Sequence, residues 1–431
     1  MPTIKFRSLH ALAALAALGW LTLLLGGCGG GADRTKAQLR LVDASTGYSA
    51  LDLVVHGQVR QGGVAYAANA GYVAIDPGNA DTTLNSAGSP TALLTFTPAL
   101  AKNRHYTLLA YGNAGALAQV LLDEDVAAPA DGKTLLRVVN GAPDAGNLDV
   151  YLTGSGDDLA AAVPVLGGAS ATPSGWLTVN SATWRLRVTA AGSKTDLRLD
   201  LAALLLSSKQ VATLVLTPGR GGVLVNALLV TQQGDVTRLD NTQARVRVAA
   251  GASGGGAVSA SLGGVTLMSG VGSPAVGLYA LVPAGPASAA LGVNGNSAPV
   301  TSLSLAAGGD YTLLVWGPPT APRAGLIEDD NHLPNDSTQA KVRLLNGLAD
   351  LGTPLALTVD FVPVADGVAA GTASGYGSVA ASITASLSVT AAGLGTPLVG
   401  ASNQTFVAGA NYTVFTLGSA ASPVGILRKD R

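Results

Sequence analysis

Apolar side chains recur at every second position in many short segments of the chain. Leu148, Val150 and Leu152 alternate with Asp149, Tyr151 and Thr153, and residues 184–189 and 196–201 follow the same rule. Successive side chains of a β-strand point to opposite faces of a sheet, so a period of two predicts strands with one apolar face. The strands are separated by Gly, Pro, Asn and Ser, which favours antiparallel sheets that cover a core on one side.

Four segments of the chain open alike, which indicates an internal repeat. Each opening is apolar and carries an arginine at the same position, and these arginines are spaced 97, 110 and 96 residues apart: Arg40, Arg137, Arg247 and Arg343. A glycine followed closely by an aromatic residue recurs in the middle of each copy: Gly71-Tyr72, Gly175-Trp176, Gly277-Leu278-Tyr279 and Gly375-Tyr376. A late apolar strand is the third recurring marker. Three markers in a constant order make chance similarity between the four segments improbable.

The late strand begins with a Tyr-Thr pair at Tyr106, Tyr311 and Tyr412, and only the second copy departs, with Ala212. Each tyrosine follows a turn, as in the tyrosine corner of β-sandwiches, where the hydroxyl bonds to the backbone a few residues upstream. We expect these three side chains to be structural rather than ligand-binding.

Repeats of about 100 residues built from short alternating strands predict an all-β fold. The expected architecture is four tandem immunoglobulin-like antiparallel β-sandwich domains after an N-terminal lipoprotein signal peptide. The predicted segments are a signal peptide at 1–27, a lipidated tether at 28–36, and repeats at 37–132, 133–241, 242–337 and 338–431.

The first 27 residues have the plan of a secretory signal, with basic residues, an apolar stretch over residues 11–25, and small residues at the end. The run Leu25-Gly26-Gly27-Cys28 resembles the lipobox of bacterial lipoproteins, which implies cleavage before Cys28 and lipidation of its thiol. Cys28 is the only cysteine in the chain. The alternative is a plain transmembrane anchor. Gly29, where some lipoproteins carry Asp, implies sorting to the outer membrane by the same resemblance.

Composition narrows the class of protein. The chain has 431 residues, 12% of them charged, a net charge of −1, 56 glycines and a mean hydropathy of +0.38. Such a chain can bury cores and is not of the disordered class, and its charge gives no attraction for nucleic acid. Beyond residue 27 we find no uninterrupted apolar run near 18 residues, so no further membrane span is expected.

Nearly all of the chain from Gln38 to Arg431 resembles DUF4397, a bacterial cell-envelope family described only as a domain of unknown function. The likeness rests on Arg137-Val138-Val139-Asn140-Gly141-Ala142-Pro143-Asp144, on Leu148-Asp149-Val150-Tyr151, on the glycine–aromatic marker and on the late Tyr-Thr pair. The second copy departs at Ser207-Ser208-Lys209-Gln210, and the third loses the Pro-Asp turn. The resemblance implies a fold and a location, and it brings no activity, cofactor or functional residues.

Catalytic motifs are not apparent in the sequence, and we expect neither enzyme activity nor a cofactor. His56, His105 and His332 share no ligand spacing, and Ser253 matches the nucleophile-elbow pattern only by letter, inside a glycine loop. Acidic clusters at two junctions are the one hint of metal chemistry. Calcium prefers carboxylate and carbonyl oxygens, so the candidate ligands are Asp123, Asp125, Asp329 and Asp330, with solvated turns as the alternative.

We therefore expect a non-enzymatic cell-envelope lipoprotein that acts as a spacer or as a binding module for proteins or surfaces. Its partners would be the membrane, through the lipid anchor, and an envelope protein or polysaccharide. Four domains in line would reach roughly 150 Å, from 30 to 40 Å each. One alternative is carbohydrate binding through exposed aromatic residues: Trp176, Tyr279, Trp316 and Tyr376. A hydrolase is the remote alternative.

Overall fold

The structure is a computed structural model that describes residues 34–300, 303–394 and 396–431. These residues form β-strands and one short 3₁₀ turn, η1 (Pro143–Ala145), so the all-β prediction is confirmed. The predicted signal peptide and Cys28 lie outside the described residues. Within the described ranges, no helix is long and apolar enough to cross a membrane.

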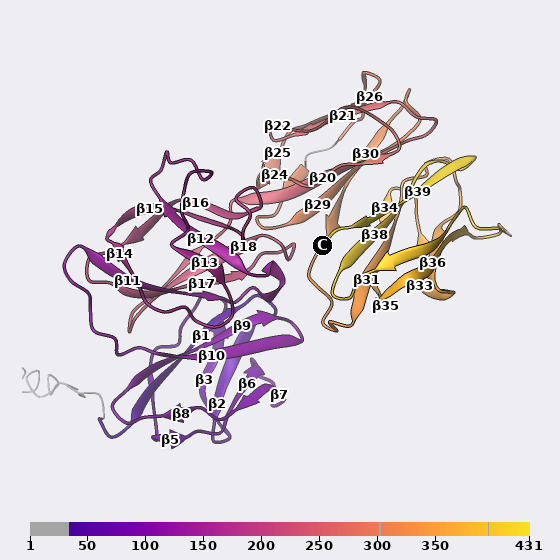
Figure 1. The fold of residues 1–431 in the computed structure, drawn as a ribbon. Coiled ribbons are helices and arrows are strands. Elements are labelled where there is room, and N and C mark those ends of the chain that lie inside the picture. Colours follow the sequence, from indigo (N-terminus) through magenta and orange to yellow (C-terminus); the bar gives the residue numbers. More distant parts are fainter. Residues whose placement is uncertain (1–33, 301–302, 395) are drawn as a thin grey trace, which may run out of the picture.

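We call residues 37–132, 133–241, 242–337 and 338–431 repeats 1 to 4, after the predicted boundaries. In each repeat, the opening strand belongs to one main sheet, here the first sheet, and the middle strands form another, the second sheet (Figure 1). The immunoglobulin-like topology and the domain boundaries themselves stay predictions.

Repeat 1 has a first sheet in the order β10-β9-β1-β4 and a second sheet in the order β3-β2-β6-β7, with β5 and β8 forming a small pair. Its strands are β1 (Ala37–Ser45), β2 (Ala50–Val55), β3 (Gln58–Ala65), β4 (Val73–Ile75), β5 (Gly78–Asn79), β6 (Thr82–Ser86), β7 (Ala92–Phe96), β8 (Ala99–Leu100), β9 (His105–Asn113) and β10 (Ala116–Asp123).

Repeat 2 has a first sheet in the order β14-β11-β17-β18-β19 and a second sheet in the order β13-β12-β15-β16. Its strands are β11 (Lys133–Asn140), β12 (Leu148–Thr153), β13 (Leu166–Ala169), β14 (Leu177–Asn180), β15 (Ala182–Ala190), β16 (Leu197–Leu206), β17 (Val211–Pro218), β18 (Val225–Thr231) and β19 (Val236–Leu239).

Repeat 3 has a first sheet in the order β23-β20-β29-β30, where β24 also pairs with β20, a second sheet in the order β22-β21-β26-β27, and a small pair of β25 and β28. Its strands are β20 (Gln243–Ala252), β21 (Ala257–Leu262), β22 (Val265–Gly272), β23 (Ala275–Val276), β24 (Ala280–Pro283), β25 (Gly285–Ala287), β26 (Ala289–Val293), β27 (Asn296–Ser297), β28 (Leu303–Leu305), β29 (Asp310–Gly317) and β30 (Arg323–Asp329).

Repeat 4 has a first sheet in the order β34-β31-β38-β39, where β35 also pairs with β31, and a second sheet in the order β33-β32-β36-β37. Its strands are β31 (Gln339–Asn346), β32 (Leu355–Val359), β33 (Val362–Val368), β34 (Thr372–Ala373), β35 (Gly377–Ala380), β36 (Ser382–Ala391), β37 (Val399–Phe406), β38 (Asn411–Ser419) and β39 (Ser422–Lys429).

Each repeat contains one parallel strand pair in its first sheet. The opening strand runs parallel to the late strand in the pairs β1–β9, β11–β17, β20–β29 and β31–β38. The pairing is parallel because the chain crosses to the second sheet and returns before it forms the late strand. The register is the same in all four copies, so the arginine of the opening strand always faces the threonine of the late strand.

A separate apolar core fills each repeat, and the alternating residues supply it. Leu148, Val150 and Leu152 of β12 are buried in the core of repeat 2, as the period of two predicts. The opposite face of β12 is buried as well, which the pattern did not indicate. Asp149 accepts hydrogen bonds there from the N–H groups of Gly168 and Gly192, each at 2.8 Å, and so fastens two loops to the strand.

The tyrosine-corner prediction is confirmed. The hydroxyl oxygens of Tyr106, Tyr311 and Tyr412 accept hydrogen bonds from backbone N–H groups five residues upstream, at 3.2, 2.9 and 2.9 Å. In repeat 2, where alanine replaces the tyrosine, the corresponding Ser207 N–H donates to Oε1 of Gln210 at 2.9 Å. The glutamine side chain therefore takes over the acceptor role of the missing hydroxyl.

The repeats pack side by side in two pairs instead of standing in a single line (Figure 1). Between repeats 1 and 2, an apolar cluster joins the two first sheets and includes Val42, Leu109, Val139 and Val215. Between repeats 3 and 4, the equivalent positions form a second cluster with Ala249, Leu314, Leu345 and Phe415. The outer faces of the opening strands are therefore buried between repeats.

Candidate functional site

The most regular polar feature of the molecule is the arginine of each opening strand. All four arginines are almost completely buried, between 1% and 8% exposed. Each Nε donates to the threonine hydroxyl directly opposite on the late strand, in the pairs Arg40–Thr107 at 2.7 Å, Arg137–Thr213 at 2.8 Å, Arg247–Thr312 at 2.9 Å and Arg343–Thr413 at 3.0 Å. The threonine of the Tyr-Thr marker therefore supplies the hydrogen-bond acceptor for the arginine, and the tyrosine forms the tyrosine corner.

An aromatic ring lies against each of these guanidinium groups. The pairs are Arg40 with Tyr72, Arg137 with Trp176, Arg247 with Tyr279 and Arg343 with Tyr376, with the guanidinium carbon 4.6 to 5.1 Å from the ring centroid. The rings are the residues of the glycine–aromatic marker. Because an aromatic face attracts a cation, the marker and the opening arginine form one structural unit in each repeat. In the sequence, the opening arginine and the glycine–aromatic marker are two separate features with no visible relation.

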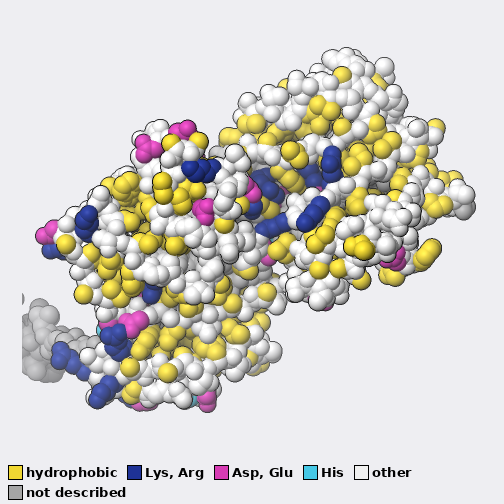
Figure 2. All heavy atoms as spheres, in the orientation of Figure 1, with side chains coloured by type: hydrophobic (Ala, Val, Ile, Leu, Met, Phe, Trp, Pro, Cys, Tyr) yellow, Lys and Arg dark blue, Asp and Glu magenta, His cyan; other side chains and the backbone are white. Residues whose placement is uncertain are grey.

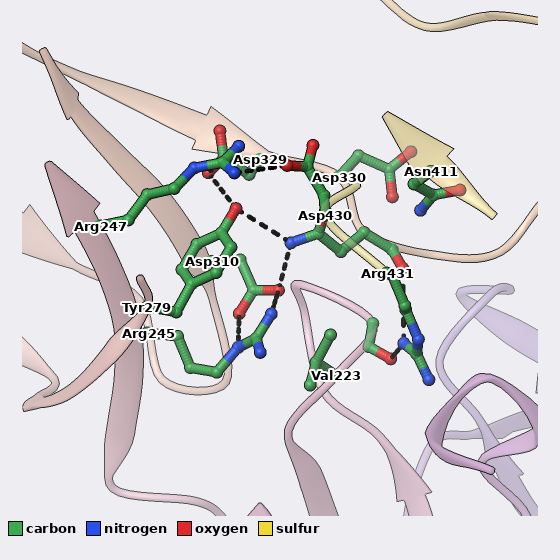
Figure 3. A network of polar contacts seen from close by, with 12 residues as sticks. Val223, Arg245, Arg247, Tyr279, Asp310, Asp329, Asp330, Asn411, Asp430 and Arg431 are labelled. Carbon is green, nitrogen blue, oxygen red and sulfur yellow. Dashed lines mark hydrogen bonds and ion pairs between the residues drawn. The ribbon is translucent and has the colours of Figure 1, made fainter. Parts of the chain in front are cut away.

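We call the contact region between the two repeats of a pair a joint. At the joint between repeats 3 and 4, carboxylates contact the arginine and aromatic residues (Figure 3). Arg343 of repeat 4 is paired with Asp329 at the end of repeat 3, and Arg247 of repeat 3 with Asp430 at the end of repeat 4. The Tyr279 hydroxyl donates to Asp329 at 2.6 Å. Burial alone would raise the pKa of Asp329, but the charges of Arg343 and Arg247 outweigh it and leave that pKa lowered. These crossed pairs are buried and tie the two repeats together.

The joint between repeats 1 and 2 has the same plan with one carboxylate fewer. Glu124, which is 2% exposed, pairs with Arg40 at 3.1 Å and with Arg137 at 3.4 Å. Gln232 stands at the position that Asp430 occupies in the other joint, and its side-chain amide bonds to the backbone of Val126. Burial raises the pKa of Glu124, although Arg40 and the Gln233 N–H lower it in part.

A glycine loop of repeat 2 enters the joint between repeats 3 and 4. Gly221 donates its N–H to Gly308 O at 2.7 Å and accepts from the Asn331 N–H at 3.1 Å. A Cβ atom at Gly221 would lie 2.6 Å from the backbone nitrogen of Asp310, so only glycine fits. Arg431 reaches the same loop, where its guanidinium bonds to Gly222 O (Figure 3). Through these hydrogen bonds, the loop holds the first pair of repeats against the second.

The four calcium candidates have cationic partners in the structure. Arg104 pairs with Asp123 and, at 3.6 Å, with Asp125, Arg343 pairs with Asp329, and Lys341 pairs with Asp330 at 3.1 Å. The ring nitrogens of His105 and His332 also lie 2.9 Å from Asp125 and 2.6 Å from Asp330. Burial would raise the pKa of Asp330, but His332 and Lys341 leave it lowered. In the part of the chain that the structure describes, no group of three or more His, Cys, Asp or Glu side chains could hold a metal ion. The calcium sites stay a prediction that this geometry does not support.

The aromatic residues proposed for carbohydrate binding are half-buried and engaged. Trp176, Tyr279 and Tyr376 lie against arginines at the joints, as described above. Trp316 packs on the apolar cluster between repeats 3 and 4. These rings are therefore occupied by packing within the molecule, and they do not form an open platform.

A cleft of about 1020 Å³ opens where loops of repeats 1, 2 and 3 meet strands β31 and β35 of repeat 4. Its walls include Tyr48 and Tyr66 of repeat 1, Arg220 and Arg238 of repeat 2, and the segment 330–336 that leads from repeat 3 into repeat 4. Lys and Arg side chains gather along the boundary between the two pairs (Figure 2). The cleft could not be predicted from the sequence, because its residues are scattered along the chain and share no motif.

Comparison with known families identifies tandem copies of one domain. The model of the family described as "Domain of unknown function (DUF4397)" matches residues 37–151 and 244–353, together just over half of the chain. Each match begins at the opening strand of a pair and ends inside the second member of that pair. No curated protein gives a significant match.

Proposed function

The chain belongs to the DUF4397 family, and from that premise we propose that it is a non-enzymatic cell-envelope lipoprotein whose four repeats form one rigid binding scaffold. The observation that carries the proposal is the set of buried arginine joints. Removing one partner of a buried, hydrogen-bonded ion pair costs about 3 to 5 kcal/mol, so each repeat of a pair depends on its neighbour to keep its buried charges matched. Surfaces made from several repeats then keep a fixed shape, as a binding site requires.

A spacer is the weaker form of this proposal. A spacer gains length when its repeats stand in line, whereas here the first sheets cover each other in pairs. Small-angle X-ray scattering distinguishes the two forms. We expect a maximum dimension well below the roughly 150 Å of four domains in line. A maximum dimension near that length would contradict the scaffold.

Lipidation of Cys28 is the second component of the proposal, and it rests on the lipobox-like sequence. A Cys28→Ser variant is expected to lose the lipid mass and to leave the membrane fraction or remain uncleaved. Gly31→Ser, three residues further on, is the matched control and should behave like the unaltered protein. A Cys28→Ser chain of mature size that still fractionates with membranes would refute lipid anchoring.

The outer membrane is the proposed location, and the side on which the repeats are displayed decides which partners they meet. Protease treatment of whole cells, with and without permeabilised outer membranes, reports that side. Digestion of intact cells would favour a surface partner, and digestion only after permeabilisation a periplasmic one.

Carbohydrate binding is the second candidate function, and one observation favours it over a purely protein-binding role. The molecule has a large cleft with two tyrosines and several amide side chains in its walls. Such a mixture is typical of ligand sites that combine apolar contact with a few placed polar groups.

A further inference from the structure

The cleft lies where the two pairs of repeats meet, so its shape depends on the whole molecule. Repeat 1 contributes the segment 46–48 and the turn after β9, repeat 2 the glycine loop, and repeats 3 and 4 the connection between them. The volume of about 1020 Å³ is at the upper end of the range for small-molecule sites, roughly 300 to 1,000 Å³. A ligand of several linked rings would fit this space.

Two tyrosine rings are fixed at the cleft. Tyr48 packs on the core of repeat 1, and its hydroxyl accepts a hydrogen bond from the Gly115 N–H at 3.0 Å. The Tyr66 hydroxyl is 2.8 Å from Oγ1 of Thr217, and the Arg238 guanidinium lies 5.2 Å from its ring centroid. Because Arg238 already lies against the Tyr66 ring, Tyr48 is the ring that can offer apolar surface to a ligand, at little entropic cost since its contacts hold it in place.

The cations in the cleft are already neutralised by carboxylates of the chain. Arg220 pairs with Glu328 at 2.5 Å, Arg238 with Asp240 at 2.6 Å, and Lys341 with Asp330 at 3.1 Å. An anionic ligand would have to displace these partners. The remaining guanidinium N–H groups and carboxylate oxygens favour neutral groups that both donate and accept hydrogen bonds.

Amide side chains add donors and acceptors of the same kind at the cleft. Asn335 is exposed there, next to the turn of repeat 1 that carries Gly115. Gln339 also lines the cleft, and its side-chain nitrogen bonds with Asp336 at 3.1 Å. Hydroxyl groups, which donate and accept at one atom, match this set.

From this combination we propose that the cleft binds a neutral oligosaccharide, with Tyr48 against a sugar ring and Asn335 and Gln339 on the hydroxyls. The inference rests on the proposed binding scaffold and names the ligand class. The walls are mainly loops, whereas peptides add to exposed strand edges or lie in apolar grooves. A neutral sugar therefore fits better than a peptide or an anionic polymer.

The test uses the full-length protein in detergent and isothermal titration with maltohexaose, cellohexaose and chitohexaose. We expect at least one to bind. Asn335→Ala should weaken binding by about ten-fold, the effect of losing roughly 1.4 kcal/mol of hydrogen bonding. Ala307→Trp places an indole on an exposed cleft residue and should abolish binding.

The matched control is Gln58→Ala, which removes an exposed amide on β3, a strand that does not line the cleft. It should bind like the unaltered protein, and circular dichroism should show all variants folded. Polygalacturonate and a peptide library are titrated in the same way. The inference would be overturned if none of the three sugars binds, if only polygalacturonate or the peptide library binds, or if binding survives Ala307→Trp. Each result is independent of whether Cys28 is lipidated, so it leaves the proposed location untouched.

Discussion

Asp43 lies where repeats 2 and 4 carry asparagine, and the comparison shows what this position needs. The Oδ1 atoms of Asp43, Asn140 and Asn346 each accept a backbone N–H two residues further on. The asparagines also donate Nδ2 to carbonyl groups, as from Asn346 to Val368 O at 2.9 Å. The Oδ2 atom of Asp43 is buried and finds no hydrogen-bond partner among the described residues. Only a protonated Asp43 could donate as the asparagines do.

The first prediction concerns the pH dependence of this residue. Burial raises the pKa of Asp43 from 3.8 to about 7, although the Ser45 N–H lowers it in part. The carboxyl group therefore stabilises the fold fully below the pKa of the unfolded chain, near 4, and this contribution is lost as the pH rises to 7. Asp43→Asn should remove that loss and raise the free energy of unfolding at pH 8 by about 1 to 3 kcal/mol.

Urea denaturation at pH 5 and pH 8 measures the effect. Asp131→Asn is the control, because the Asp131 side chain is 84% exposed and should change neither value. A drop in stability on going from pH 5 to pH 8 that is as steep in Asp43→Asn as in the unaltered protein would show that Asp43 is already ionised at pH 5.

At the residue scale, the sequence showed the arginines and aromatic residues but not their relation. Both are recurring markers, so their importance was evident. Their contact was not, because Arg137 lies on β11 and Trp176 directly precedes β14, so the two meet only after these strands have paired. The role of Tyr106 was easier to predict, because its hydroxyl accepts a hydrogen bond from a backbone N–H only five residues away.

At the scale of elements, three equivalent hairpins close with two-residue turns in the left-handed region. The second turn residue is Gly57 in repeat 1, Gly264 in repeat 3 and Phe361 in repeat 4, with φ values of 73°, 82° and 65°. Glycine accepts this conformation freely, whereas other residues lose about 1 to 2 kcal/mol. Phe361 is 91% exposed, so packing offsets little of that strain.

Phe361→Gly is therefore expected to stabilise repeat 4, by about 1 kcal/mol in the free energy of unfolding. The comparison variant is Val362→Gly, which removes a neighbouring side chain that is 62% exposed on β33. It should destabilise the hairpin, because glycine is unfavourable within a strand. Equal effects of the two substitutions in thermal or urea denaturation would show that turn strain is not the cause.

The elements themselves were largely predictable, and their partners were not. Alternation identified β12, β15 and β16 because each buries alternate residues in one core. The parallel pairing of β11 with β17 was missed, since a period of two describes the faces of a strand and not its neighbours. The buried outer faces of the opening strands were missed for a related reason, because a second repeat covers them.

For the whole molecule, the joint between repeats 3 and 4 separates two adjacent carboxylates with opposite roles. Asp329 is fully buried between Arg247 and Arg343, whereas the Asp330 side chain is 57% exposed. Asp329→Asn should lower the free energy of unfolding by about 3 kcal/mol or more, because it leaves buried arginines without a charge partner. Asp330→Asn should cost less than about 1 kcal/mol.

The same two variants test the predicted calcium site. We expect EDTA and added calcium to leave the melting temperature of the unaltered protein unchanged. A rise with calcium that disappears in Asp330→Asn would restore the metal site. The lowered pKa of Asp329 also sets the direction of the acid response, since its stabilisation is complete near neutral pH and is lost as the pH falls through that pKa.

The pairing of the repeats has a consequence for how such chains gain and lose copies. A repeat without a partner would expose its arginine, its aromatic ring and an apolar strip that includes the position of Val42 or Leu345. That surface is a ready site for aggregation or for unintended association. Duplication of a single unit would therefore be penalised, and duplication of two tolerated. We expect related chains that keep the arginine, the threonine and the aromatic marker to contain even numbers of repeats.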